Sequence, residues 1–135
     1  MKNKGFTLIE LMLVVTIIGV LAAMVMPRFS GRSEQAKIAA AKTDINASIS
    51  TSLDLFEMDN GRYPISSEGL DALSSNPKSS DLVNWSGPYL KRRPIDPWGR
   101  QYKYLSPGSH NQDYDLFSFG PDGVEDNEDD IKNWE

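Results

Sequence analysis

The sequence predicts an α+β protein in which one long N-terminal helix packs on a small antiparallel sheet. Three observations support this fold. Residues 6–26 are apolar apart from one acid, the following segment to about Asp59 has helical periodicity, and two short segments rich in β-forming residues lie near the C-terminus. The chain has 135 residues, which suffices for one modest domain.

The N-terminal apolar segment predicts a transmembrane helix. Phe6–Met26 contains no charged residue except Glu10, and at 1.5 Å per residue it would span about 31 Å, close to the thickness of a bilayer core. An ordinary secretory signal has a shorter apolar core. Lys2 and Lys4 precede the segment and favour a cytoplasmic N-terminus. We therefore expect the chain after Pro27 to face outward.

The next segment predicts an amphipathic continuation of the helix. Pro27 is expected to end or kink the spanning part, with Gly19 as a second site of bending. Beyond it, apolar residues recur at steps of three and four: Ile38, Ala41, Ile45, Ile49, Leu53 and Phe56. The sequence "DNGRYP" at 59–64 then predicts a stop.

The remaining elements are short. Residues 66–75, "SSEGLDALSS", predict a short helix with a serine cap. Tyr102, Tyr104 and Leu105 predict a strand, and residues 114–120 predict its partner. Ile131 and Trp134 are apolar enough to require a place in the core.

Composition excludes several classes of function. The chain carries 14 basic and 19 acidic residues, and this net charge of −5 argues against nucleic acid as a partner. It contains no cysteine, which excludes a disulfide framework, thiol catalysis and a cysteine zinc site. There is no P-loop and no Ser/His/Asp arrangement, and the only histidine, His110, lies in a polar stretch where we expect a surface role. We therefore expect a protein that is not an enzyme.

Residues 122–130, "DGVEDNEDD", hold six carboxylates in nine positions. One interpretation is a solvated acidic tail. The other is a Ca²⁺ site, because dense like charges repel without a cation and hard oxygen ligands suit calcium. The spacing does not match an EF-hand.

The stretch "KGFTLIELMLVV" resembles the N-terminal signature of type IV pilins and type II secretion pseudopilins. The resemblance implies that a prepilin peptidase cuts between Gly5 and Phe6 and methylates the new N-terminus. Glu10 would then lie one turn inside the helix, where it complements the helix dipole. In this family it also pairs with the Phe6 amine of a neighbouring subunit. The alternative is that Glu10 lies shallow in the membrane and reaches the headgroups.

Three further blocks, "GRYPISSEGLDAL", "GPYLKRRPIDPWGRQYKYLSPG" and "DLFSFGPDGVEDNEDDIKNW", resemble the major pseudopilin of type II secretion systems. The resemblance implies a leader at 1–5, a transmembrane and assembly helix at 6–28 and a periplasmic globular domain at 29–135. It implies a single-pass protein of the inner membrane that polymerises into a periplasmic pseudopilus, with minor pseudopilins and the inner-membrane secretion platform as partners.

The same resemblance implies a calcium site in the C-terminal loop. Its carboxylate ligands fall on Asp122, Asp129 and Asp130, and its backbone carbonyl ligands on Phe119 and Asn127. This loop is more acidic than is usual in the family, and the additional acids could supply further ligands: Glu125, Asp126 and Glu128. In "DPWG" at 96–99 we expect a purely structural turn, with Trp98 covering the core. The basic run "KRRP" at 91–94 is expected to be solvated surface.

Two other functions remain open at this point. One is a type IV pilin for adhesion, twitching or DNA uptake, against which the acidic balance, the missing cysteines and the "DPWG" block count. The other is a membrane-anchored calcium-binding enzyme or sensor, which would leave the pattern of Gly5, Phe6 and Glu10 unexplained.

Overall fold

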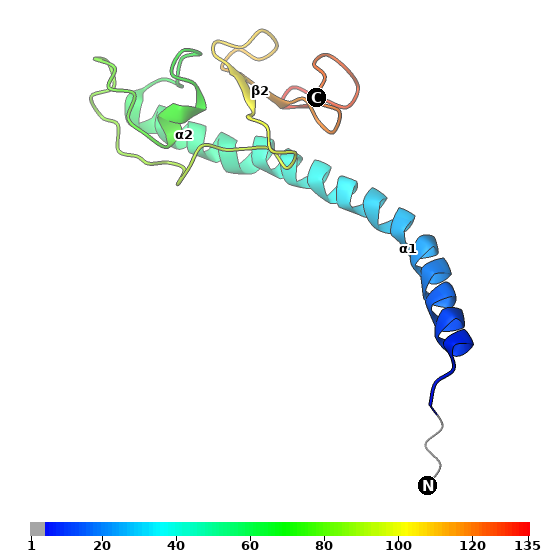
Figure 1. Cartoon of the computed structure of the whole chain (residues 1–135). Helices are drawn as coiled ribbons and strands as arrows, with labels where there is room; N and C mark the ends of the chain where they lie inside the picture. Colours follow the sequence, from blue (N-terminus) through cyan, green and yellow to red (C-terminus); the bar gives the residue numbers. More distant parts are fainter. Residues whose placement is uncertain (1–4) are drawn as a thin grey trace. The chain divides into compact units, whose positions relative to one another are not determined.

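A computed structural model describes residues 5–135, apart from the side chains of residues 27–30. Residues 1–4 of the predicted leader lie outside the described part. The chain forms two compact units, one ending at Gln35 and one comprising Ala36–Glu135, and each is described by itself. The predicted division at residues 5 and 28 stays a prediction. Figure 1 traces the elements in chain order.

The first unit is the N-terminal part of helix α1, which runs from Leu8 to Thr43 over 36 residues. The apolar side chains from Phe6 to Met26 are exposed to their surroundings. The expectation that Pro27 could end the helix is wrong, since α1 continues through it. A proline removes one backbone donor from a helix, and the remaining ladder of this long element suffices to continue it.

In the second unit the helix continues through a π-helical turn, η1 (Asp44–Ser48), into α2 (Ile49–Asn60). The buried residues of this region recur mostly at steps of four. An α-helix turns by about 100° per residue, so each step of four places the next side chain about 40° further around the axis, and three steps add up to about 120°. The wider π turn compensates for this rotation. The predicted stop is confirmed, because Gly61 adopts a left-handed φ of 75° and its N–H caps the Glu57 carbonyl at 2.7 Å.

The short helix predicted at 66–75 is a 3₁₀ helix, η2 (Gly69–Leu73), and no serine side chain caps it. Glu68 occupies the N-cap position, but its side chain does not cap the helix either. Its carboxylate accepts hydrogen bonds from the Ile65 N–H at 3.0 Å and from both terminal nitrogens of Arg62, at 2.8 and 2.9 Å.

The sheet has three antiparallel strands in the order β1 (Lys103–Leu105), β2 (Asp115–Ser118) and β3 (Ile131–Lys132). The two predicted strands are confirmed, with Tyr104 opposite Leu116. The sequence did not predict β3 as a strand, since two residues carry no alternation to detect.

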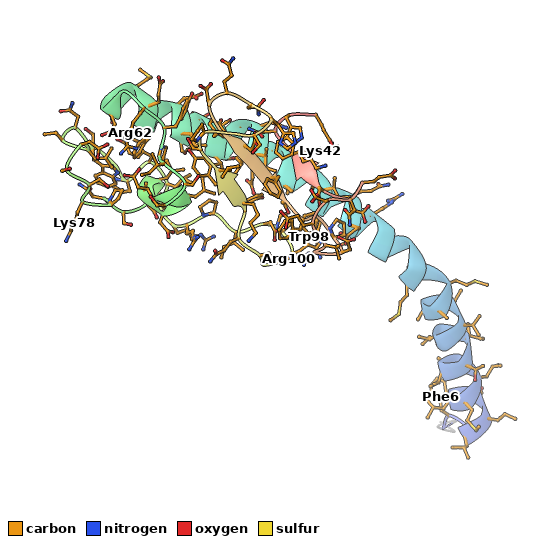
Figure 2. All side chains as sticks on the ribbon, turned by 90° about the horizontal axis from the view of Figure 1, so that it is seen from above. Phe6, Lys42, Arg62, Lys78, Trp98 and Arg100 are labelled. Carbon is orange, nitrogen blue, oxygen red and sulfur yellow. The ribbon has the colours of Figure 1, made fainter. Side chains whose placement is uncertain are left out.

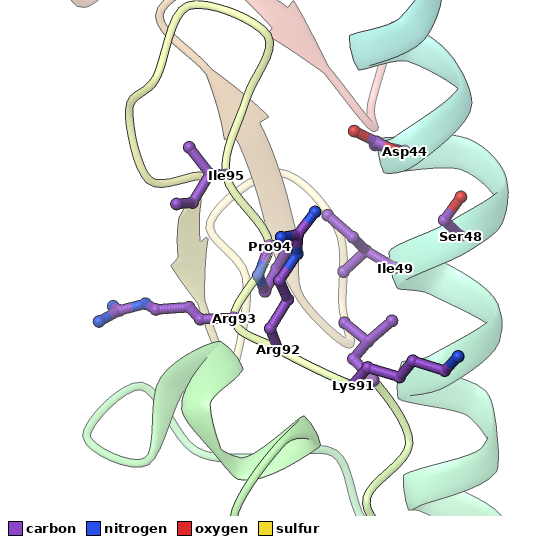
Figure 3. A pocket seen from close by; sticks show the side chains of 9 residues that line it. Asp44, Ser48, Ile49, Lys91, Arg92, Arg93, Pro94 and Ile95 are labelled. Atoms are coloured by element: carbon purple, nitrogen blue, oxygen red, sulfur yellow. The ribbon is translucent and has the colours of Figure 1, made fainter.

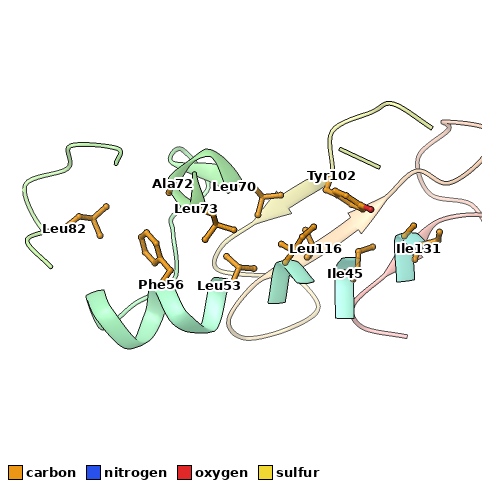
Figure 4. Close-up of a cluster of buried hydrophobic side chains, with 12 residues drawn as sticks. Ile45, Leu53, Phe56, Leu70, Ala72, Leu73, Leu82, Tyr102, Leu116 and Ile131 are labelled. Carbon is orange, nitrogen blue, oxygen red and sulfur yellow. The ribbon is translucent and has the colours of Figure 1, made fainter. Parts of the chain in front are cut away.

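The core lies between the helix and the sheet (Figure 4). Its buried side chains come from every part of the second unit: Ala41, Ile45, Ile49, Leu53, Phe56, Leu70, Ala72, Leu73, Leu82, Tyr102, Leu116 and Ile131. Ile38 and Trp98 are partly buried against it. The predicted helical core face and the covering role of Trp98 are therefore confirmed.

Candidate functional site

The N-terminus of α1 is closed by a reciprocal hydrogen-bond pair. The Thr7 N–H donates to Glu10 Oε2 at 2.9 Å, and the Thr7 hydroxyl also lies 3.0 Å from that oxygen. In return, the Glu10 N–H donates to the Thr7 hydroxyl at 3.3 Å. This is a capping box, in which two unpaired donors of a helix start are satisfied.

The capping box gives Glu10 a partner within its own chain. Sequence reasoning missed it, although the spacing "TLIE" is its signature. Gly5 and Phe6 directly precede the helix, and Phe6 is exposed. In the described part of the chain, one helix is long and apolar enough to cross a membrane, judged by length and composition.

The acidic segment is a closed loop between β2 and β3. It begins at Gly120, whose φ of 67° is left-handed. A Cβ on Gly120 would lie only 2.1 Å from the Asp129 carbonyl oxygen, so the two ends of the loop touch there. The loop leads into β3, where Ile131 is buried, so it is not a free tail, but its acids other than Asp130 are exposed. The choice between solvated acids and a calcium site therefore stays open.

Two of the predicted ligand residues have separate hydrogen-bond partners inside this loop, Asp122 through its carboxylate and Asp129 through its backbone. Asp122 accepts from the Val124 N–H at 3.0 Å and from the Asn127 amide at 2.6 Å. The Asp129 N–H donates to Asn127 Oδ1 at 3.0 Å. Within residues 5–135 no three acidic or histidine side chains converge closely enough to hold a metal ion.

One observation nevertheless fits a hard cation. Asp130 is 6% exposed; its Oδ2 accepts the Asp126 N–H at 2.9 Å, but its Oδ1 is buried with no hydrogen-bond partner among the described residues. A buried oxygen without a partner is costly, and a bound ion is one of its common explanations. The predicted ligand atoms that lie near Asp130 in the sequence are all oxygens, and oxygen is the ligand type that Ca²⁺ prefers.

A group of hydrogen bonds and a ring contact around Asp115 and His110 holds the C-terminal end of the chain. Asp115 is buried and accepts the backbone N–H groups of Ser109, His110 and Asn111 at 2.7–3.2 Å. Burial by itself favours the neutral acid, but these bonds and that of the His110 ring hold the pKa of Asp115 below its usual value. The His110 ring lies 3.0 Å from Asp115 and stacks on Trp134 at 4.2 Å between centroids. His110 is thus a surface residue that also orders the C-terminus.

The "DPWG" turn is built around a buried carboxylate. Asp96 accepts the backbone N–H groups of Trp98 at 3.1 Å and Arg100 at 2.8 Å, and the Ser118 hydroxyl of β2 at 2.7 Å. The sequence predicted the turn but not this bond to the sheet. The adjacent basic run is exposed, as expected, and lines a groove opposite Asp44 of η1 (Figure 3).

Comparisons with known proteins agree over nearly the whole chain. Residues 1–26 match the prokaryotic N-terminal methylation motif, and residues 28–134 match the family described as type II secretion system (T2SS), protein G. The chain is 47% identical to the type II secretion system core protein G of Pseudomonas aeruginosa, over 99% of this chain and 96% of that protein. For the Escherichia coli K12 protein of the same name the identity is 46%, over 98% and 92%.

A solved structure supports the same relationship. The crystal structure of the major pseudopilin from the type 2 secretion system of enterohaemorrhagic Escherichia coli matches with a TM-score of 0.68 and 42% identity, covering 77% of this chain and 87% of that chain.

A methylation motif on an apolar helix of spanning length, followed by a small α+β head, defines a pilin-like protein. The chain belongs to the type II secretion system protein G family, the major pseudopilins. It is a structural protein and not an enzyme, and its motif implies processing by a prepilin peptidase. The family membership decides against the type IV pilin and against the calcium-binding enzyme or sensor.

Proposed function

We propose that this major pseudopilin is anchored in the inner membrane by the apolar part of α1, places its globular unit in the periplasm and polymerises into the pseudopilus that pushes folded proteins out of the cell. The mature chain begins at Phe6. The carrying observation is the family match together with the apolar part of α1, residues 8–26, whose one acid, Glu10, lies in the first turn. Nucleic acid is not a partner of so acidic a chain.

Assembly requires partners that recognise the N-terminus. The principal partner is a second copy of the chain, with minor pseudopilins and the inner-membrane secretion platform as the others. Glu10 pairs with the Phe6 amine of a neighbouring subunit. A pair of opposite charges in a medium of low dielectric favours one register strongly, and an unpaired acid at that depth is costly.

We also propose that the acidic loop binds Ca²⁺ through the carboxylates of Asp122, Asp129 and Asp130 and the carbonyls of Phe119 and Asn127. Bound Ca²⁺ would supply the positive charge that the loop lacks. The buried Oδ1 of Asp130 supports this assignment, and Asp122 would exchange the amide of Asn127 for the ion. The neighbouring acids of the loop could contribute further oxygens.

A thermal melt tests the calcium proposal. The full-length processed chain in detergent is unfolded in calcium, in EGTA and in magnesium. At a calcium concentration of 100 times Kd, binding adds about 2.7 kcal/mol to stability. We expect a lower Tm in EGTA and poor rescue by magnesium, which resists dehydration.

Asp122→Ala should melt in calcium as the wild type does in EGTA, whereas Asp113→Ala, an exposed acid outside the loop, should keep the calcium response. Identical wild-type melts in calcium and EGTA would remove the calcium site from the proposal.

A further inference from the structure

One basic side chain reaches the start of the acidic loop. Arg100 ends the "DPWGR" turn, and its Nη2 donates to the carbonyl oxygens of Gly120 at 2.6 Å and Pro121 at 3.3 Å. Figure 2 labels Arg100 and the neighbouring Trp98 in the globular unit. Among the residues that the structure describes, the guanidinium is not in ion-pair contact with any carboxylate. Its position is therefore set by the backbone of the loop and not by a surface ion pair.

The loop backbone leaves room for this guanidinium. Gly123 has a φ of 72°, and a Cβ there would lie 2.7 Å from Nη1 and 2.9 Å from Cζ of Arg100. Because two glycines have no Cβ, two close contacts are possible: Gly123 lies against Arg100, and Gly120 lies against the Asp129 carbonyl. The guanidinium lies at the neck of the loop, where the loop's two ends meet.

The backbone of Arg100 is also held next to the start of the acidic loop. Its N–H donates to the buried carboxylate of Asp96, which accepts the Ser118 hydroxyl through its other oxygen. The Gly120 N–H in turn donates to that hydroxyl at 3.2 Å. The Nε of Arg100 is buried without a partner among the described residues. A buried donor without a partner opposes folding, so the two bonds of Nη2 to the loop carbonyls have to offset this cost.

We propose that Arg100 is a positioning residue that holds the acidic loop (residues 120–130) closed at its neck without the help of calcium. The part of this inference that concerns calcium rests on the proposed function. In the wild type, Arg100 and calcium stabilise the same closed loop, so either one keeps the loop largely shut. Hydrogen bonds to charged groups are stronger than neutral ones, and a single Nη2 here serves two carbonyls.

Hydrogen exchange on the full-length chain in detergent tests this role, followed at the loop amides of Gly120, Val124 and Asp126. In EGTA, Arg100→Gln should exchange at these amides about tenfold to a hundredfold faster than the wild type, while the amides of β2 keep their wild-type rates. Saturating calcium should bring the variant back toward the wild type. Arg92→Gln, at an exposed position of the basic run, is the matched control and should exchange as the wild type.

A second variant reaches the same contact from the other side. Gly123→Ala should expel the guanidinium and also strain the backbone at a φ of 72°, so it should speed loop exchange in EGTA at least as much as Arg100→Gln. Wild-type loop exchange of Arg100→Gln in EGTA would overturn the proposal, as would equally fast exchange throughout β2. If instead Arg100→Gln exchanges faster than the wild type in EGTA and saturating calcium does not slow it, the calcium site fails and the role of Arg100 stands.

Discussion

At the scale of single residues, Glu10 combines an observed role in capping α1 with the proposed role in pairing subunits. A charged side chain at the centre of a membrane helix costs about 3 kcal/mol on insertion scales. The capping box with Thr7 satisfies this carboxylate within its own chain. Its charge also complements the dipole of its own helix, and in the proposed filament it would pair with the Phe6 amine of a neighbouring subunit.

Two substitutions separate these roles. Glu10→Gln keeps a capping-box acceptor and removes the charge, and Glu10→Val removes both. We expect both variants to insert and to be cleaved, because each lowers the cost of membrane insertion, and both to fail in filament assembly. Crosslinking of subunits and electron microscopy measure assembly. Normal filaments from Glu10→Gln would show that capping, and not pairing with Phe6, is the function of this acid.

Within the globular unit, Glu68 is a nearly buried acid that is held by an ion pair. Its side chain is 6% exposed and pairs with Arg62 at 2.8 Å. We expect Glu68→Gln to lower the free energy of unfolding by about 2 kcal/mol, measured by urea denaturation. Asp71→Asn, which removes a half-exposed pair with Arg93 at 3.1 Å, is the control and should cost less than about 0.5 kcal/mol.

The same residue predicts a pH dependence. The hydrogen bond from Arg62 lowers the pKa of Glu68 from 4.5 to about 2. A carboxyl group with a depressed folded-state pKa stabilises the fold above its unfolded pKa and loses that effect as the pH falls. The wild type should therefore lose stability between about pH 4.5 and pH 2. Glu68→Gln should lose less over that range, and parallel curves for the two proteins would contradict the assignment.

At the scale of elements, α2 offers a matched pair of leucines. Leu53 is fully buried in the core, whereas Leu55, two residues further on, is 46% exposed. Leu53→Ala should cost about 2–5 kcal/mol through lost burial and a cavity. Leu55→Ala should cost less than about 1 kcal/mol, also by urea denaturation. Equal losses would mean that the helix presents a different face to the sheet.

The sequence predicted these elements where the pattern was long. The recurrence from Ala41 to Phe56 identified the core face of the helix, and the Asn-Gly pair at 60–61 located its end. The π turn at Asp44–Ser48 was not predicted, although the steps of four between the buried residues are visible in the sequence. Strand β3 has only two residues, too few to show a period.

The candidate sites were predictable in composition but not in arrangement. The acids of residues 122–130 can be counted in the sequence, yet their partners depend on a loop whose ends meet at Gly120 and Asp129. The contact of Arg100 with Gly120 crosses about 20 residues of chain, and the contact of His110 with Trp134 at the C-terminus crosses more. Such contacts depend on the fold, and no local sequence pattern predicts them.

At the scale of the whole molecule, the chain combines an apolar helix, exposed along its first part, with a small head closed by a sheet and an acidic loop. Each part suits a filament subunit: the helix presents apolar surface to lipid or to other helices, and the head carries few features that a catalyst would need.

The most direct measurement of the role in type II secretion is deletion of the gene in the source strain, with wild-type complementation. The fraction of exoprotein in the culture supernatant and the number of surface pili are scored together. We expect exoproteins to accumulate in the periplasm, surface pili to be unchanged and complementation to restore secretion. Normal secretion with loss of surface pili would contradict the role in type II secretion.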